Sequence, residues 1–190
     1  MSENARSGRS KLWLIAAVCA TPVVASYFMF YLSPPAKRTY HGELLETRPL
    51  PEARLVLADG TAFESSRLRG KWVLLMVDAG NCTEFCRRKL FTMRQLRQGQ
   101  GNDMERIERV WLISDETAVP ATVMDDFCGT LMVRAAGSAW LAQLPVARAT
   151  SDYLYVIDPL GNLVLRYGRE VDPVNIIKDL VRLLKTSRIG

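Results

Sequence analysis

Cys82 and Cys86 are the residues of this chain with the clearest potential for chemistry. They stand between a continuous apolar run and an amphipathic stretch, which predicts that the pair lies where a buried strand ends and a helix begins. Backbone N–H groups and the positive end of the helix dipole stabilise a thiolate at such a junction. Three cations, residues 87–89, follow directly. We therefore interpret the pair as an activated dithiol; the alternative is a buried, inert pair.

The spacing of the pair adds a geometric condition. Three residues separate the cysteines, and side chains four positions apart on a helix have Cβ atoms roughly 5 to 6 Å apart. A disulfide needs Cβ atoms about 3.5 to 4.5 Å apart, so Cys82 must lie in the loop before the helix if the bond is to close. Two thiolates can instead hold one soft ion, and thiolates select Cu(I). Cys82 and Cys86 are thus candidates both for dithiol catalysis and for copper binding.

The remaining candidates for chemistry are few. His41 is the single histidine, which excludes sites that need paired imidazoles, and we interpret it as a residue of a solvated linker. Cys19 lies inside an apolar run, where it is expected to pack as a small hydrophobe. Cys128 is expected on a helix as a core residue, with a resolving thiol for Cys82 or Cys86 as the sharper alternative.

Hydrophobic patterning predicts the elements that must position the cysteine pair. Continuous apolar runs predict buried strands, and apolar residues at helical spacing predict amphipathic helices. The predicted elements are a hairpin over residues 54–57 and 61–68, strands over 71–77, 109–114 and 130–134, helices following residue 82 and over 121–127, 138–144 and 174–185, and a second hairpin over 152–157 and 163–167. A parallel strand pair with a helical crossover, finished by an antiparallel hairpin, predicts a thioredoxin-like α/β domain with a central mixed sheet.

A separate segment precedes this domain. Residues 12–32 carry no charged side chain, which at 1.5 Å per residue is enough to span roughly 30 Å of hydrocarbon. We predict a cytoplasmic tail over residues 1–11, a single transmembrane helix over 12–32, a Pro-rich linker over 33–51 and the thioredoxin-like domain over 52–190. In a bacterium this places the domain in the periplasm.

The charge distribution agrees with a membrane protein. Of the 25 Lys and Arg residues five precede Thr39, with one acidic residue beside them, so the remainder carries 20 basic and 19 acidic residues. A nearly neutral body attached to a basic end lacks the basic face that nucleic-acid binding requires. We therefore expect a membrane and a thiol-containing protein as partners, and no nucleic acid.

Four motifs together resemble one known family. They are GKWVLL at residues 70–75, the Cys82/Cys86 spacing, ISDET at 113–117 and YVIDPLGN at 155–162. In this order they are similar to the Sco family, membrane-anchored thioredoxin-like proteins that help deliver copper to cytochrome c oxidase. The resemblance implies a role in oxidase assembly, with a respiratory oxidase subunit as partner.

The resemblance also implies a set of copper ligands. The family binds copper through both cysteines and a histidine five residues before the aromatic residue that opens the YVIDP-like strand. That position is Thr150 here, so Cys82 and Cys86 carry over and the third ligand does not. Two-coordinate Cu(I) binding and simple dithiol exchange both remain open. The competing functions are a general membrane-tethered thiol-disulfide oxidoreductase and a non-catalytic docking module.

Overall fold

The computed structural model describes residues 3–32, 40–146 and 148–187. The chain divides into two compact units, residues 1–39 and 40–190. In the first unit a single helix, α1 (Glu3–Leu32), contains Pro22, and Thr21 Oγ1 donates a hydrogen bond to the Ala17 carbonyl oxygen. Within the described parts of the chain, no helix is both long enough and apolar enough to cross a membrane. The predicted transmembrane segment over residues 12–32 is therefore not confirmed.

The second unit is built on one eight-stranded sheet with the order β1-β8-β7-β4-β5-β6-β2-β3. Its strands are β1 (Glu43–Pro49), β2 (Arg54–Leu57), β3 (Ala62–Glu64), β4 (Trp72–Asp78), β5 (Ile107–Ile113), β6 (Leu131–Arg134), β7 (Leu154–Ile157) and β8 (Asn162–Tyr167). Its helices are α2 (Glu84–Gln98), α3 (Ala121–Asp126), α4 (Ala139–Gln143) and α5 (Pro173–Thr186), with short 3₁₀ helices η1 (Ser65–Leu68), η2 (Gly101–Arg106) and η3 (Thr150–Asp152). These bounds confirm the predicted helices and central strands to within two residues, the usual uncertainty of element ends.

The sheet is mixed, as predicted. Strands β4 and β5 pair in parallel, as do β5 and β6, whereas β7 pairs antiparallel with both β4 and β8. The chain therefore crosses over through α2 and α3 and returns as a hairpin, which is the thioredoxin-like arrangement.

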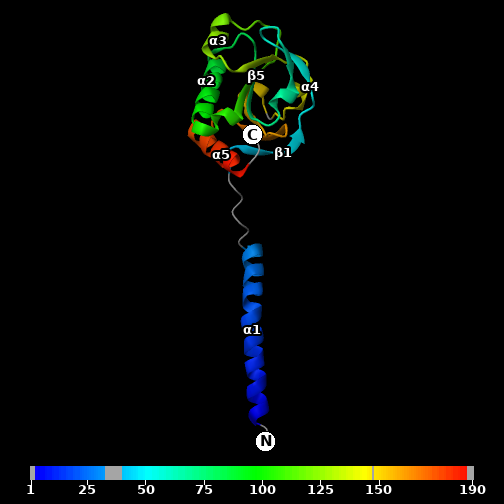
Figure 1. Cartoon of the computed structure of the whole chain (residues 1–190), viewed down its shortest axis with the longest axis vertical. Coiled ribbons are helices and arrows are strands. Elements are labelled where there is room, and N and C mark those ends of the chain that lie inside the picture. Colours follow the sequence, from blue (N-terminus) through cyan, green and yellow to red (C-terminus); the bar gives the residue numbers. More distant parts are fainter. Residues whose placement is uncertain (1–2, 33–39, 147, 188–190) are drawn as a thin grey trace. The chain divides into compact units, whose positions relative to one another are not determined.

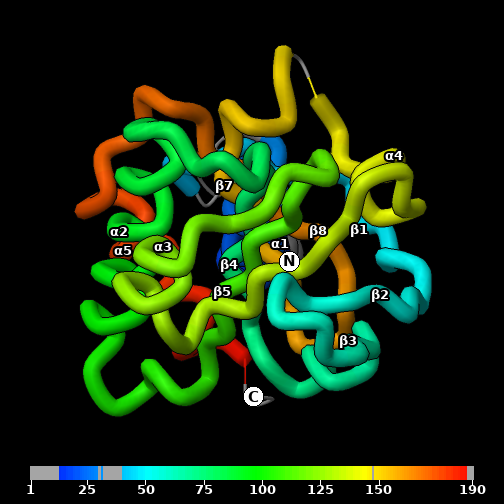
Figure 2. Tube along the Cα trace, turned by 90° about the horizontal axis from the view of Figure 1, so that it is seen from above, coloured from blue at the N-terminus to red at the C-terminus, as the bar shows by residue number. Residues whose placement is uncertain are grey.

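Two hydrophobic layers hold the sheet between its helices. Along β4 the side chains alternate, with Trp72, Leu74 and Met76 packing on one face and Val73 and Leu75 on the other. The first face is covered by α2, α3 and α5, and the second by α4 and η1. Figure 2 shows α2, α3 and α5 on the left of the sheet and α4 on the right. Because β4 is buried on both faces, nearly all of its residues are apolar, which explains the continuous apolar run in the sequence.

Strand β1 differs from the sequence prediction, which placed residues 43–49 in the linker. Its side chains are almost all exposed, so no apolar alternation marks it. It pairs with β8, and Glu43 stands opposite Arg166, whose guanidinium donates two hydrogen bonds to the carboxylate at 2.7 and 2.9 Å. This pair lowers the pKa of Glu43. A polar edge strand held by a cross-strand ion pair carries no signal that distinguishes it from a linker.

The predicted N-terminal hairpin is only partly strand. Strands β2 and β3 pair antiparallel, but the second predicted strand, residues 61–68, continues from Glu64 into the 3₁₀ helix η1. Leu68 of η1 is buried in the same layer as Trp140 of α4. This burial explains why the chain turns back toward the sheet at this point.

Candidate functional site

Cys82 and Cys86 are joined by a disulfide, with their Cα atoms 5.1 Å apart. Helix α2 begins at Glu84, so Cys82 lies in the preceding loop. This is the position that a disulfide between residues four positions apart requires. Cys82 has a φ of 41°, and among the described residues other than glycine it alone has a positive φ. A left-handed backbone at a non-glycine residue is uncommon and concentrates at functional turns.

The disulfide is buried, an environment that the interpretation as an activated dithiol does not favour. Cys82 is 4% exposed and Cys86 is fully buried. Both belong to the hydrophobic layer that includes Met76 of β4 and Val119 of the loop before α3. The low exposure of both cysteines limits the access of an outside thiolate to either sulfur.

The loop between β4 and α2 packs closely against the ISDET segment. The Gly80 N–H donates a 2.8 Å hydrogen bond to Asp115 Oδ1, and Thr117 Oγ1 donates to Asp115 Oδ2 at 2.8 Å. The bond from Gly80 lowers the pKa of Asp115. A Cβ on Gly80 would lie 2.0 Å from the Thr117 carbonyl oxygen, so only glycine fits. Two of the four motifs that carried the family resemblance thus meet at the cysteine loop.

The three cations after Cys86 have different environments. Arg87 pairs with Asp126 at 3.3 Å. Arg88 is exposed, and among the described residues no carboxylate lies within 4.0 Å of its guanidinium. Lys89 is 11% exposed and lies 2.9 Å from Asp78 Oδ2. The three cations are consecutive in the sequence, but on a helix consecutive side chains point in different directions, so each has a different environment.

Lys89 links three segments beneath the cysteine loop. Its Nζ donates hydrogen bonds to the Val77 carbonyl at 2.8 Å and to the Ser151 carbonyl at 2.7 Å, in addition to the ion pair with Asp78. Burial lowers the pKa of Lys89, and Asp78 partly opposes that shift. The lysine therefore ties η3, which contains Thr150, to the end of β4 and to α2. Sequence reasoning missed this role, since no spacing rule marks a buried lysine.

Thr150 occupies the position that the family resemblance assigns to the third copper ligand. Thr150 begins η3. The imidazole of His41 is hydrogen-bonded to Asp179 of α5. His41 therefore lies against that helix. Among the residues that the structure describes, no group of three or more His, Cys, Asp or Glu side chains could hold a metal ion. The two cysteines, once reduced, have the soft-donor chemistry that suits Cu(I).

Cys128 is exposed, so the expectation of a core cysteine is wrong. Helix α3 ends at Asp126, and Cys128 falls in the turn before β6, next to Gly129 with a φ of 75°. Its carbonyl oxygen accepts a 3.0 Å hydrogen bond from Arg109. Met124 and Phe127 pack toward the core instead, because the turn rotates Cys128 away from the helix face.

Comparison with known families identifies the class of protein. Residues 72–187 match the family model described as "Transmembrane-like, thioredoxin-like, C-terminal domain". The chain belongs to this family. A search of curated proteins found no match.

Several solved structures share the fold. Yeast Sco1 with copper bound has 18% sequence identity and a TM-score of 0.65, over 75% of this chain and 96% of that one. Bradyrhizobium japonicum ScoI with copper bound has 19% identity and a TM-score of 0.55, over 71% and 99%. BsSco, a Sco-family cytochrome c oxidase assembly protein with a disulfide switch, has 13% identity and a TM-score of 0.55, over 74% and 93%. These similarities confirm the predicted thioredoxin-like fold, and Sco proteins are among its structural neighbours.

Proposed function

We propose that this protein is a Sco-like assembly factor for cytochrome c oxidase that exchanges thiols and disulfides with a partner protein. The observation that carries the proposal is the Cys82–Cys86 disulfide at the loop that opens α2. In its reduced form the dithiol attacks a partner disulfide and forms a mixed disulfide, and the second thiolate then releases the partner as a dithiol. Two electrons pass to the partner, and Cys82–Cys86 is left oxidised.

Structural neighbours support the choice of partner. BsSco is a member of a family of cytochrome c oxidase assembly proteins and has a disulfide switch. In this chain the Cys82–Cys86 pair lies where β4 is followed by a loop and by α2. A respiratory oxidase subunit with cysteines that must be reduced before they receive metal is a client of matching chemistry.

Copper handling is the second candidate function. Structures of yeast Sco1 and of Bradyrhizobium japonicum ScoI have copper bound, and two thiolates suit Cu(I) as a transferred ion. Here the ion would be cargo held by reduced Cys82 and Cys86 alone, because neither Thr150 nor His41 supplies a further ligand. Dithiol exchange needs no third donor, so the residues support it more completely.

We further propose that residues 12–32 anchor the chain in the bacterial inner membrane, with the second unit in the periplasm. The absence of charge over this segment and the basic residues before it support this topology. A reporter that works only outside the cytoplasm tests it when fused after Gly190. A fusion active only in the cytoplasm would contradict it.

The experiment that tests the function replaces both cysteines. In cells that depend on this protein, the Cys82→Ser, Cys86→Ser double variant is expected to lower assembled oxidase activity to the level of a deletion. Cys128→Ser is the matched control, since it removes an exposed thiol of the same domain, and it is expected to retain activity. Full activity in the double variant would instead establish a docking module.

A second readout separates an assembly factor from a general oxidoreductase. An assembly factor is expected to act on a few clients, so a thiol trap on the periplasmic proteins should enrich an oxidase subunit. Rapid turnover on unrelated thiol peptides, with oxidase assembly unchanged, would favour the general enzyme.

A further inference from the structure

A pocket of about 410 Å³ opens along the first turns of α2, the helix whose first turn contains Cys86. It is lined by the first turns of α2, by the segment from η3 into β7, by the end of β8 with the loop that follows, and by the start of α5. Phe85, which lies between the two cysteines in sequence, forms part of the wall. Helices α2 and α5 lie next to each other in Figure 1. The pocket is therefore built from the same segments that position the candidate site.

The pocket combines an apolar wall with positive charge. Its charged lining residues are Arg88, Lys89 and Arg169 against the single carboxylate of Asp152. The guanidinium of Arg169 lies 3.8 Å from the centre of the Phe85 ring and 2.9 Å from Asp152, so Asp152 is already neutralised. Lys89 is likewise paired with Asp78.

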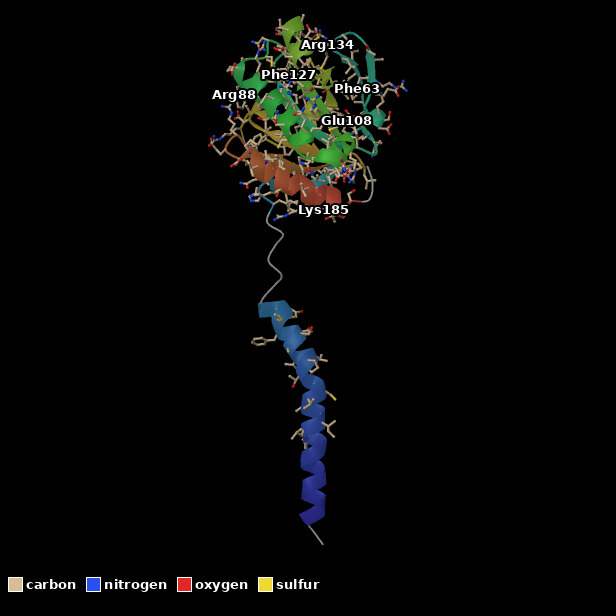
Figure 3. All side chains as sticks on the ribbon, turned by 60° about the vertical axis from the view of Figure 1, so that its left-hand side comes forward. Phe63, Arg88, Glu108, Phe127, Arg134 and Lys185 are labelled. Atoms are coloured by element: carbon tan, nitrogen blue, oxygen red, sulfur yellow. A yellow bond between two sulfur atoms is a disulfide. The ribbon has the colours of Figure 1, made fainter. Side chains whose placement is uncertain are left out.

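Arg88 remains available for an external anion. It is exposed on α2, and none of the described carboxylates lies within ion-pair distance of it. Figure 3 shows Arg88 at the outer edge of the domain, away from Phe63 on the opposite side. An acidic group placed over the pocket would meet Arg88 and Arg169, while a neighbouring apolar side chain would contact Phe85.

A partner in exchange with the cysteine pair has residues within reach of this pocket. A mixed disulfide holds two Cα atoms within roughly 7 Å of each other. Each further residue of an extended partner chain adds up to about 3.5 Å. Residues two to four positions from the partner's cysteine can therefore reach one or two turns along α2. Phe85 and Arg88 lie within that range along α2.

We propose that this pocket selects the partner by binding a segment with an acidic residue next to an apolar one, close to the partner's reactive cysteine. The inference rests on the proposed thiol–disulfide exchange and adds the chemistry of its client. The positive lining attracts the acidic residue, and the Phe85 wall receives the apolar one. Arg88 is the principal specificity residue, since Lys89 and Arg169 already have carboxylate partners.

The test compares three dithiol peptides that differ in one residue. Each carries two cysteines and a flanking Phe, with Glu, Gln or Lys beside the Phe. The full chain in a nonionic detergent is mixed in its oxidised form with each peptide, and samples are alkylated over time and analysed by mass spectrometry. Each exchange reduces Cys82–Cys86 and oxidises the peptide dithiol. We expect the Glu peptide to react about tenfold faster than the Lys peptide at low ionic strength, with the ratio falling as salt is added.

Variants locate the effect. Arg88→Glu is expected to invert the preference between the Glu and Lys peptides, and Arg88→Gln to reduce it. Arg67→Glu changes charge equally on an exposed arginine of η1 that does not line the pocket, and it is expected to keep the wild-type ratio. The rate ratio within each variant is the readout, so a change in overall reactivity does not obscure it.

The outcomes separate the inference from the function on which it rests. Equal rates for the three peptides, or a preference unaffected by Arg88→Glu, would overturn the pocket proposal and leave the exchange function standing. If neither the peptides nor dithiothreitol reduce the disulfide in the folded chain, the exchange function fails and the pocket proposal fails with it.

Discussion

The imidazole Nδ1 of His41 lies 3.1 Å from Oδ1 of Asp179, which joins the start of the second unit to α5. Asp179 is fully buried and its Oδ2 also accepts hydrogen bonds from the backbone N–H of His41 at 2.7 Å and of Gly42 at 3.3 Å, and from the Tyr167 hydroxyl at 3.3 Å. The single histidine of the chain thus has a structural contact: it lies just before β1 and is bound to α5, whereas the cysteines lie at the start of α2.

Replacing Asp179 by Asn is expected to destabilise the protein by about 2 to 4 kcal/mol, because several buried donors lose a charged acceptor. The free energy of unfolding in urea measures this. Asp125→Asn, at an exposed site of α3, is the matched control and is expected to change stability by less than about 0.5 kcal/mol. An equal change in the free energy of unfolding for the two variants would show that the hydrogen bonds of Asp179 do not stabilise the fold.

Tyr155 predicts a pH dependence. Burial raises its pKa to about 12, and its hydroxyl donates a 3.1 Å hydrogen bond to the Pro145 carbonyl. The folded state thus holds this proton more strongly than the unfolded state does. The stabilisation is complete below pH 10 and is lost as pH rises through 12. Wild type is expected to exceed Tyr155→Phe in stability at pH 8, and this advantage is expected to be smaller at pH 11. A difference independent of pH would contradict the assignment.

Lys89 and Asp78 are expected to depend on each other. Lys89→Met leaves the Asp78 carboxylate, which is 12% exposed, without its counter-ion, and should cost about 3 kcal/mol. Adding Asp78→Asn removes the unpaired charge, so the double variant is expected to recover a substantial part of that loss. Chemical denaturation of the four proteins in the cycle gives the coupling energy. Additive effects would show that the pair is not coupled.

The hairpins, the central strands and α2 follow from the hydrophobic pattern, because buried strands and amphipathic helices leave periodic signals. Strand β1 did not, since its exposed charges resemble a linker. The contact between His41 and Asp179 joins residues 138 positions apart, and no local pattern marks it. The position of Cys82 before the helix could be predicted from disulfide geometry, whereas its burial could not, because that depends on how the ISDET segment packs.

The threonine at position 150, where the family resemblance places a histidine, leads to a prediction about copper. The reduced full chain is expected to bind at most one Cu(I), with binding lost in Cys82→Ser or Cys86→Ser, and to give no stable Cu(II)–thiolate charge-transfer band. Thr150→His is expected to create such a band, since Lys89 holds the neighbouring Ser151 against α2. Competition with a Cu(I) chelator and visible absorption measure both effects. A band in the wild-type chain that survives His41→Ala would show that another donor completes the site.

The most direct test of the central claim follows two electrons out of the cysteine pair. The full chain is reduced with dithiothreitol, freed of it, and mixed with an excess of a peptide disulfide, and the thiols of both molecules are then alkylated and mapped by mass spectrometry. Thiol–disulfide exchange predicts that the peptide gains two thiols for each chain that forms the Cys82–Cys86 bond, while Cys128 is labelled throughout. A pair that resists reduction in the folded chain, or that stays reduced in the presence of the peptide disulfide, would contradict the proposed function.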